Sequence, residues 1–174
     1  MSKSINKRQH AVNEGEKLQA PPVERTPAAN TLSWLAVQVM QLNGLLIAAG
    51  DTLAAPAGQT SARWQVLAAV EEAPMSVAQI ARAMNLTRQS VQRVADLLTE
   101  DGLTAYEDNP AHVRAKLLRL TPKGRKALQT IQAGQKVWAN ALAAKLDEAR
   151  LRAASAVLGE LQQALLAQAS PQAE

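Results

Sequence analysis

Apolar residues recur at helical spacing in three long stretches of this chain. The first predicted helix covers 31–50, where apolar side chains return every three or four residues. The second begins at Thr121 and Pro122, a capping residue followed by a proline at the first helical position, and the third covers 147–168. Apolar residues of the third helix alternate between spacings of three and four, a seam typical of coiled coils: Leu151, Ala154, Leu158, Leu161 and Leu165.

Shorter helices are predicted between the first two long ones. A loop around Pro56 and Gly58 is followed by Thr60, which is suited to cap a helix that ends before Pro74. Downstream, the apolar stripe of "MSVAQIARAMN" stops at Met84 and a new one begins after Leu86. The pattern therefore predicts three short helices within 60–101.

The second and third of these short helices form a predicted helix-turn-helix. Ser76 and Gln79 have the spacing of a capping box, and Thr87 caps the helix that Gly102 ends. Only Asn85 and Leu86 separate the two helices, which is the spacing of the motif. The buried stripe of the third helix is predicted to be Val91, Val94, Ala95 and Leu98.

A β-hairpin is predicted after the helix-turn-helix. Two short segments of 103–121 flank the turn signal Asn109-Pro110. A helix-turn-helix followed by a hairpin is a winged helix. We therefore expect a mainly α fold with a small β-hairpin wing, in one domain over 30–170. Its winged helix-turn-helix core covers about 60–121, flanked by long dimerisation helices over about 31–50 and 122–168.

The long flanking helices have two interpretations. Their apolar faces pack within one chain, or they pair with a second copy. Because a small winged-helix core cannot cover so much apolar surface, we expect a homodimer.

The N-terminal residues 1–29 are polar and charged, and prolines close the segment, so we expect a flexible arm. A solvated tail is one interpretation, and contact with DNA through Lys3, Lys7 and Arg8 is the other. The arm lacks the apolar run of a signal peptide.

Polar residues interrupt the longest apolar stretch, "WLAVQVMQLNGLLIAAG", at Gln38, Gln41 and Asn43. These interruptions argue against a membrane span. We therefore expect a cytoplasmic protein without a membrane partner.

Charge is concentrated in the predicted winged helix. The chain has 19 Lys plus Arg against 15 Asp plus Glu, a net charge of +4. Between Ser76 and Lys126 there are nine basic and five acidic residues, so this segment carries the whole excess. Such a distribution suits a polyanionic partner.

Several kinds of chemistry find no support in the residues. The chain has no cysteine, which excludes disulfides and thiolate sites, and its two histidines are far apart in sequence, so neither a metal site nor a cofactor is predicted. Adjacent carboxylates such as Glu71 and Glu72 point in different directions on a helix. No phosphate-binding glycine loop and no nucleophile beside a base is present. An enzyme with catalytic residues is not expected.

The third short helix has the features of a DNA recognition helix. Arg pairs with guanine and Gln with adenine in the major groove, whereas hydroxyl residues at the helix start suit phosphate. No carboxylate occurs from Leu86 to Ala95, although the positive end of a helix favours one. Asp96 is predicted to be exposed on the same face. The alternative interpretation is an ordinary solvated face. The predicted DNA-binding residues of this helix are Thr87, Arg88, Gln89, Ser90, Gln92 and Arg93.

Basic residues also lie on the predicted wing. Arg114 and Lys116 fall near its tip or rising strand, where a minor-groove contact is expected, and Ser76 supports the interface from the preceding helix. Single arginines are also common on hairpins that bind nothing.

The order of these parts resembles the MarR family of bacterial transcriptional regulators over residues 31–168. The segments that carry the resemblance are "TSARWQVLAAV" and "SVAQIARAMNLTRQSVQRVADLLTEDGLTAYEDNPAHVRAKLLRLTPKG". The resemblance implies a homodimeric repressor that binds a pseudo-palindromic operator of double-stranded DNA. A small-molecule effector would release the repressor from the operator. The effector's identity and site remain unknown. Four residues suit either a pocket or plain core: Trp34, Met40, Arg63 and Trp64.

One feature departs from the family pattern. Where the family wing commonly has Asp-x-Arg, this chain has His112, Val113 and Arg114. A solvated His112 is one interpretation, and a hydrogen-bonding or titrating His112 that tunes DNA affinity is the other.

A winged helix that contacts only proteins, as a scaffold subunit, is the competing function, and it predicts no salt-sensitive DNA affinity.

Overall fold

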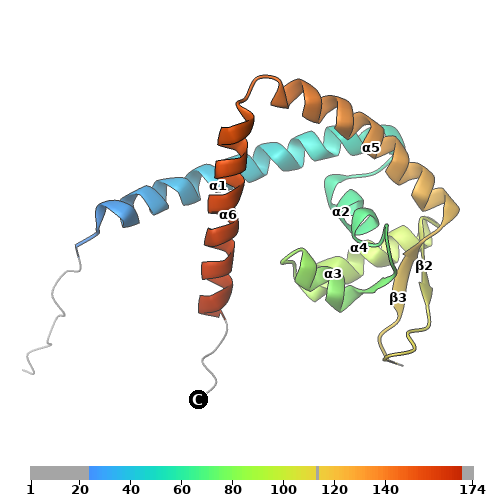
Figure 1. The fold of residues 1–174 in the computed structure, drawn as a ribbon. Coiled ribbons are helices and arrows are strands. Elements are labelled where there is room, and N and C mark those ends of the chain that lie inside the picture. Colours follow the sequence, from blue (N-terminus) through green and yellow to red (C-terminus); the bar gives the residue numbers. More distant parts are fainter. Residues whose placement is uncertain (1–23, 113, 170–174) are drawn as a thin grey trace, which may run out of the picture. The chain divides into compact units, whose positions relative to one another are not determined.

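The computed structural model describes residues 24–112 and 114–169 (Figure 1). The predicted fold class is confirmed: most of the chain is helical, with a small antiparallel sheet. The elements in order are α1 (Pro27–Ala54), the 3-10 turn η1 (Ala55–Ala57), α2 (Ser61–Ala69), β1 (Met75–Ser76), α3 (Val77–Ala83), α4 (Arg88–Glu100), β2 (Thr104–Glu107), β3 (Leu117–Leu120), α5 (Pro122–Ala143) and α6 (Glu148–Ala169).

Helix α1 is longer at both ends than the predicted 31–50. The Oγ1 of Thr26 accepts from the backbone N–H of Ala29 at 3.1 Å. Pro27 therefore takes the first helical position, where its missing N–H would have had no partner. Residues 27–29, which we expected in the arm, are helical, whereas the basic residues at 3, 7 and 8 lie outside the described residues.

By length and composition, the helix over residues 27–57 meets the criterion for a membrane span, and an 18-residue window within it has a mean hydropathy of 1.5. No other helix in the described part of the chain meets it. The polar residues Gln38, Gln41 and Asn43 therefore do not exclude a span by themselves. The chain also divides into two compact units within α1, after Met40, and the winged helix belongs wholly to the second unit.

The wing belongs to a three-stranded sheet of order β1-β3-β2. β2 pairs with β3 as predicted, with Thr104 opposite Leu120 and Glu107 opposite Leu117. The two-residue strand β1 was missed, because Met75 and Ser76 read as the start of a helix. Ser76 has both roles: it pairs with Leu117, and its side chain caps α3 through the predicted capping box. α2 accordingly ends at Ala69, before the predicted stop at Pro74, because the chain must turn into β1.

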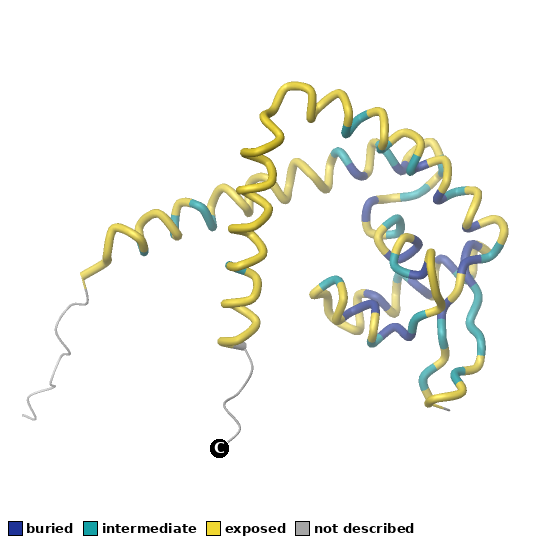
Figure 2. The backbone as a smooth tube through the Cα atoms, in the orientation of Figure 1, coloured by how far each residue is buried: buried dark blue, intermediate teal, exposed yellow. Residues whose placement is uncertain are grey.

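One hydrophobic core joins the helices of the winged helix to its sheet (Figure 2). Five of these elements each contribute a large apolar side chain that is less than 2% exposed: Leu67 from α2, Ile80 from α3, Leu98 from α4, Leu118 from β3 and Leu128 from α5. Burying each of these contributes roughly 1.5–3 kcal/mol. Of the stripe predicted for α4, three members are buried and Val94 is half-buried. The core therefore fixes which face of α4 stays outside.

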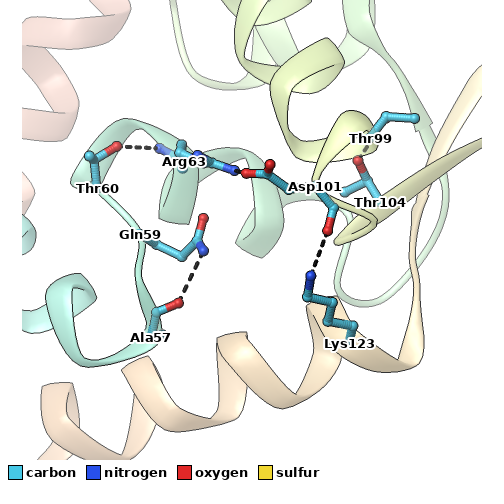
Figure 3. A network of polar contacts seen from close by, with 8 residues as sticks. All are labelled: Ala57, Gln59, Thr60, Arg63, Thr99, Asp101, Thr104 and Lys123. Carbon is cyan, nitrogen blue, oxygen red and sulfur yellow. Dashed lines mark hydrogen bonds and ion pairs between the residues drawn. The ribbon is translucent and has the colours of Figure 1, made fainter.

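A polar network ties the end of α4 to α2 and α5 (Figure 3). Arg63 forms an ion pair with Asp101, the residue that follows α4. The Nζ of Lys123 donates to the carbonyl oxygen of Asp101 at 2.8 Å. The hydrogen bond and charge of the Arg63 guanidinium hold the pKa of the Asp101 carboxyl below its usual value. The far end of α4 is thus held in place by two neighbouring helices.

Helix α6 has no buried residue among the side chains described. Its predicted seam is exposed throughout, apart from Leu161, which is half-buried. Trp34 and Met40 of α1 are also exposed, at 72% and 73%, so the plain-core interpretation of these two residues is wrong for the single chain. Monomeric soluble proteins rarely leave so many large apolar side chains in contact with water.

Candidate nucleic-acid interface

The start of α4 is held by a local network of hydroxyl groups. Thr87 caps the helix as predicted, because its Oγ1 accepts from the backbone N–H of Ser90 at 3.1 Å. The Thr87 hydroxyl donates to Ser90 Oγ at 3.0 Å, and Ser90 Oγ donates to the Thr87 carbonyl at 2.9 Å. Both hydroxyl protons are therefore used within the cap. The two residues stabilise the helix start, and their phosphate contacts remain a prediction.

The outer face of α4 presents the four long polar side chains expected there. Arg88, Gln89, Gln92 and Arg93 are all exposed, opposite the buried stripe. Within the described residues, neither arginine forms an ion pair. Two uncompensated guanidinium groups near a helix N-terminus create a positive surface.

A groove of about 290 Å³ lies between α4 and the wing. It brings together residues that are far apart in sequence: Ser76 and Arg88 from the helix-turn-helix, and Arg114 and Lys116 from the loop before β3. Gln92 and Tyr106 also line it. Five of the predicted site residues therefore surround one concave surface that carries three positive charges. Gln89 and Arg93 instead lie on the outer side of α4.

Asn109 organises the loop of the wing. Its Nδ2 donates to the carbonyl oxygen of Ala115 at 2.9 Å, and its Oδ1 accepts from the backbone N–H of Ala111 at 3.0 Å. The His112 backbone takes part in the same turn, but its side chain makes no hydrogen bond within the described residues. Arg114 has no carboxylate partner there either. No described side chain therefore pairs with Arg114 in place of the aspartate of the family's Asp-x-Arg pattern.

The side chain of Gln92, which we expect to contact DNA, already takes part in hydrogen bonds within the described chain. Its Nε2 donates to Asp96 Oδ1 and to the hydroxyl oxygen of Tyr106, both at 2.8 Å. The Tyr106 hydroxyl in turn donates to Asp96 Oδ1 at 2.9 Å. These three side chains, hereafter the Gln92–Asp96–Tyr106 triad, connect α4 to strand β2.

The sequence reasoning missed Tyr106. The four-residue spacing of Gln92 and Asp96 indicates that they are neighbours on one helix face. Nothing local to Tyr106 indicates that β2 carries its hydroxyl to the same place, since that depends on how the strand packs against α4.

Tyr106 should titrate well above a free tyrosine. Burial, followed by the hydrogen bond to Asp96 and its charge, raises the pKa of Tyr106 to about 12 from 10.0. Because the pKa of Tyr106 is higher in the folded than in the unfolded protein, the shift contributes to the stability of the fold. This contribution is complete below pH 10 and is lost as the pH rises through about 12. Tyr106 is the only tyrosine in the chain, so tyrosinate absorbance reports on it alone.

Titration of the tyrosinate absorbance in the folded protein measures this pKa. The same titration in denaturant gives the pKa of Tyr106 in the unfolded chain, which we expect near 10. In Asp96→Ala the pKa should fall part of the way, because burial persists. A folded wild type that titrates near 10 would contradict the described triad.

Comparisons with known proteins bear on the same region. A sequence model of the MarR family matches residues 57–115, from η1 to the wing loop. An uncharacterized protein of Mycobacterium tuberculosis is 42% identical over 125 residues, which cover 72% of this chain and 87% of that protein.

Solved structures share the fold. The crystal structure of the M. tuberculosis transcriptional regulator MosR in complex with DNA is 26% identical with a TM-score of 0.63, covering 75% of this chain and 96% of that one. Staphylococcus aureus MarR in complex with salicylate and kanamycin is 19% identical with a TM-score of 0.68, covering 83% and 100%. At this lower identity the likeness shows the fold alone.

Proposed function

This chain belongs to the MarR family of transcriptional regulators, and on that premise we propose that it is a cytoplasmic homodimeric repressor. In this proposal it binds a pseudo-palindromic site on double-stranded DNA and leaves it when a small molecule binds. The two copies of α4 enter successive major grooves, and the wings lie beside them. The MosR structure, in which a regulator of the same fold holds DNA, supports the proposal.

The observation that carries the proposal is the groove between α4 and the wing. Arg88, Arg114 and Lys116 line it, and none forms an ion pair within the described residues. Three uncompensated cations on one concave surface repel one another. A nucleic-acid backbone supplies the missing negative charge, and the released counterions favour its binding.

Selection from a pool of random double-stranded DNA tests this function. We expect the purified protein to enrich a sequence with two-fold symmetry, whose half-sites lie about one helical turn apart. If no sequence is enriched, specific DNA binding is wrong and the scaffold alternative takes its place.

The Arg114→Ala variant should bind the selected DNA more weakly and with less dependence on salt. If Arg114 meets a phosphate, the slope of log affinity against log salt concentration falls by about one unit. Titrations at several salt concentrations measure both quantities. Arg125→Ala is the matched control, because Arg125 is exposed on α5 and does not line the groove. Identical slopes for Arg114→Ala and wild type would remove the wing from the interface.

The dimer is supported by the exposed apolar surface of α1 and α6. Among the described side chains, large exposed apolar residues occur on more than one side of α1 and along the α6 seam. A second copy that covers these helices removes the surface from water. Insertion of α1 into a membrane is the competing explanation of the hydropathy of this helix. It does not account for the exposed apolar seam of α6.

Light scattering should give about twice the chain mass of 18.6 kDa in buffer without detergent. Leu158→Asp places a charge in the seam and should shift the protein toward the monomer. The matched control is Gln163→Asp, an exposed polar position on the same helix. A monomeric wild type at micromolar concentration would exclude the dimer, and a detergent requirement would favour the membrane.

A cavity of about 680 Å³ is our proposed effector site. The part of α1 after Met40 lines it together with α2 and α4, through residues that include Ile47, Asp51, Gln65 and Ser90. A ligand there would contact both a long helix and the recognition helix. The S. aureus MarR complex with salicylate supports effector binding by this fold. Trp34, Met40, Arg63 and Trp64 do not line this cavity.

A further inference from the structure

The Gln92–Asp96–Tyr106 triad has a defined direction of hydrogen bonding. An ionised carboxylate only accepts, so the atom of Gln92 that faces Asp96 Oδ1 at 2.8 Å must be its amide nitrogen. Tyr106 gives its proton to Asp96 at 2.9 Å, so its oxygen accepts the second N–H of Gln92. Because the pKa of Tyr106 is about 12, the phenol keeps this proton at neutral pH.

Both N–H groups of Gln92 are therefore used within the protein. Its carbonyl oxygen Oε1 makes no hydrogen bond within the described residues. The side chain is exposed on the outer face of α4 and borders the groove with the wing. Gln92 is thus a glutamine that presents an acceptor and no donor.

We propose that Asp96 and Tyr106 determine base specificity by holding Gln92 as a pure acceptor, which selects a major-groove amino group on adenine or cytosine. This inference rests on the DNA-binding function proposed above. A free glutamine contacts adenine through both its donor and its acceptor, N–H to N7 and oxygen to N6. With its N–H groups occupied, Gln92 loses the N7 contact and no longer distinguishes adenine from cytosine by that means. Guanine and thymine present acceptors at the corresponding edge and are disfavoured.

The triad is suited to orientation more than to stability. Gln92 and Asp96 are exposed, and hydrogen bonds that compete with water contribute little net free energy to folding. A side chain whose rotamer is set before binding loses less entropy when it contacts a base. Asp96 and Tyr106 are positioning residues in this scheme, since they act through Gln92.

Base preference, measured by selection from a random double-stranded pool, tests the inference. Gln92→Ala should flatten the preference at one position of each half-site, which identifies the base pair that Gln92 reads. Tyr106→Phe removes one acceptor and keeps the aromatic ring that packs against the core. The freed N–H should shift the preference at that position from adenine or cytosine toward adenine, by about tenfold. Asp96→Ala should shift it in the same direction.

Two controls separate orientation from loosened packing. Thr99→Val breaks the 2.9 Å hydrogen bond between Thr99 and Thr104, which also joins α4 to β2 but does not touch Gln92. It should keep the wild-type preference. The position lost in Gln89→Ala should be unaffected by Tyr106→Phe, because Gln89 has no hydrogen bond to the triad.

The outcomes distinguish this inference from the function on which it rests. If wild type enriches a sequence but Tyr106→Phe and Asp96→Ala leave the Gln92 position unchanged, the acceptor model is wrong and DNA binding stands. The same holds if Gln92→Ala flattens no position. If wild type enriches nothing, the proposed function itself fails.

Discussion

Replacing Arg88 by alanine is expected to weaken binding to the selected DNA by at least about tenfold, the scale of a lost base or backbone contact by arginine. Arg88 occupies the first position of α4, is exposed and borders the groove that also contains Arg114 and Lys116. Its removal takes away the cation nearest the helix end that is predicted to enter the major groove. Titration of labelled DNA measures the loss.

The same substitution should leave the fold intact or slightly stabilise it. Arg88 has no ion pair among the described residues, and its charge lies at the positive end of the helix dipole. Alanine relieves this repulsion, so unfolding should become harder by a few tenths of a kcal/mol. Arg125→Ala removes an equal charge outside the groove and should bind DNA almost as wild type does. Equal affinity for Arg88→Ala and wild type would refute the recognition assignment.

Gly124→Ala should strongly destabilise the fold, because α5 approaches the backbone of Leu103 closely at this position. A Cβ at position 124 would lie 1.9 Å from the carbonyl oxygen of Leu103 and 2.9 Å from its carbon. That carbonyl cannot easily move, because it accepts from both the backbone N–H and the Oγ1 of Thr121, each at 3.1 Å. We expect a loss of about 3 kcal/mol, the upper part of the range for overpacking.

Urea unfolding at one fixed protein concentration measures this loss, since a dimer's stability depends on concentration. Gly134→Ala is the matched control in the same helix. Its Cβ would meet only Leu53 Cδ2 at 3.8 Å, an ordinary contact. The higher helix propensity of alanine should then stabilise α5 by roughly 0.5–1 kcal/mol. If both variants unfold alike, the close approach of α5 to Leu103 is not the constraint described.

Local patterns were sufficient for most of the helices and their caps. Thr60, Ser76, Thr87 and Thr121 all cap helices as predicted, because a cap depends on residues only two or three positions away. The two-residue strand β1 was missed for the opposite reason. Met75 and Ser76 are a strand only because β3, some forty residues later, supplies their partners.

The same distinction between local and distant interactions applies to the residues of the candidate site. Periodicity alone indicated that Arg88, Gln89, Gln92 and Arg93 face outward, and the structure agrees. Periodicity could not indicate that Tyr106 reaches Gln92, nor that Arg114 and Lys116 border the same groove as Arg88. Those relations depend on how β2 and the wing loop pack beside α4.

The sequence by itself therefore determined the order of the helices, most of their caps and the outward face of α4, because hydrophobic spacing and capping act over a few residues. Only the tertiary structure decided which distant side chains meet. It placed Arg114 and Lys116 of the wing loop in the same groove as Arg88, and it joined Gln92 to Tyr106 by a hydrogen bond. Contacts of this kind depend on the packing of a shared core, and no local pattern encodes them.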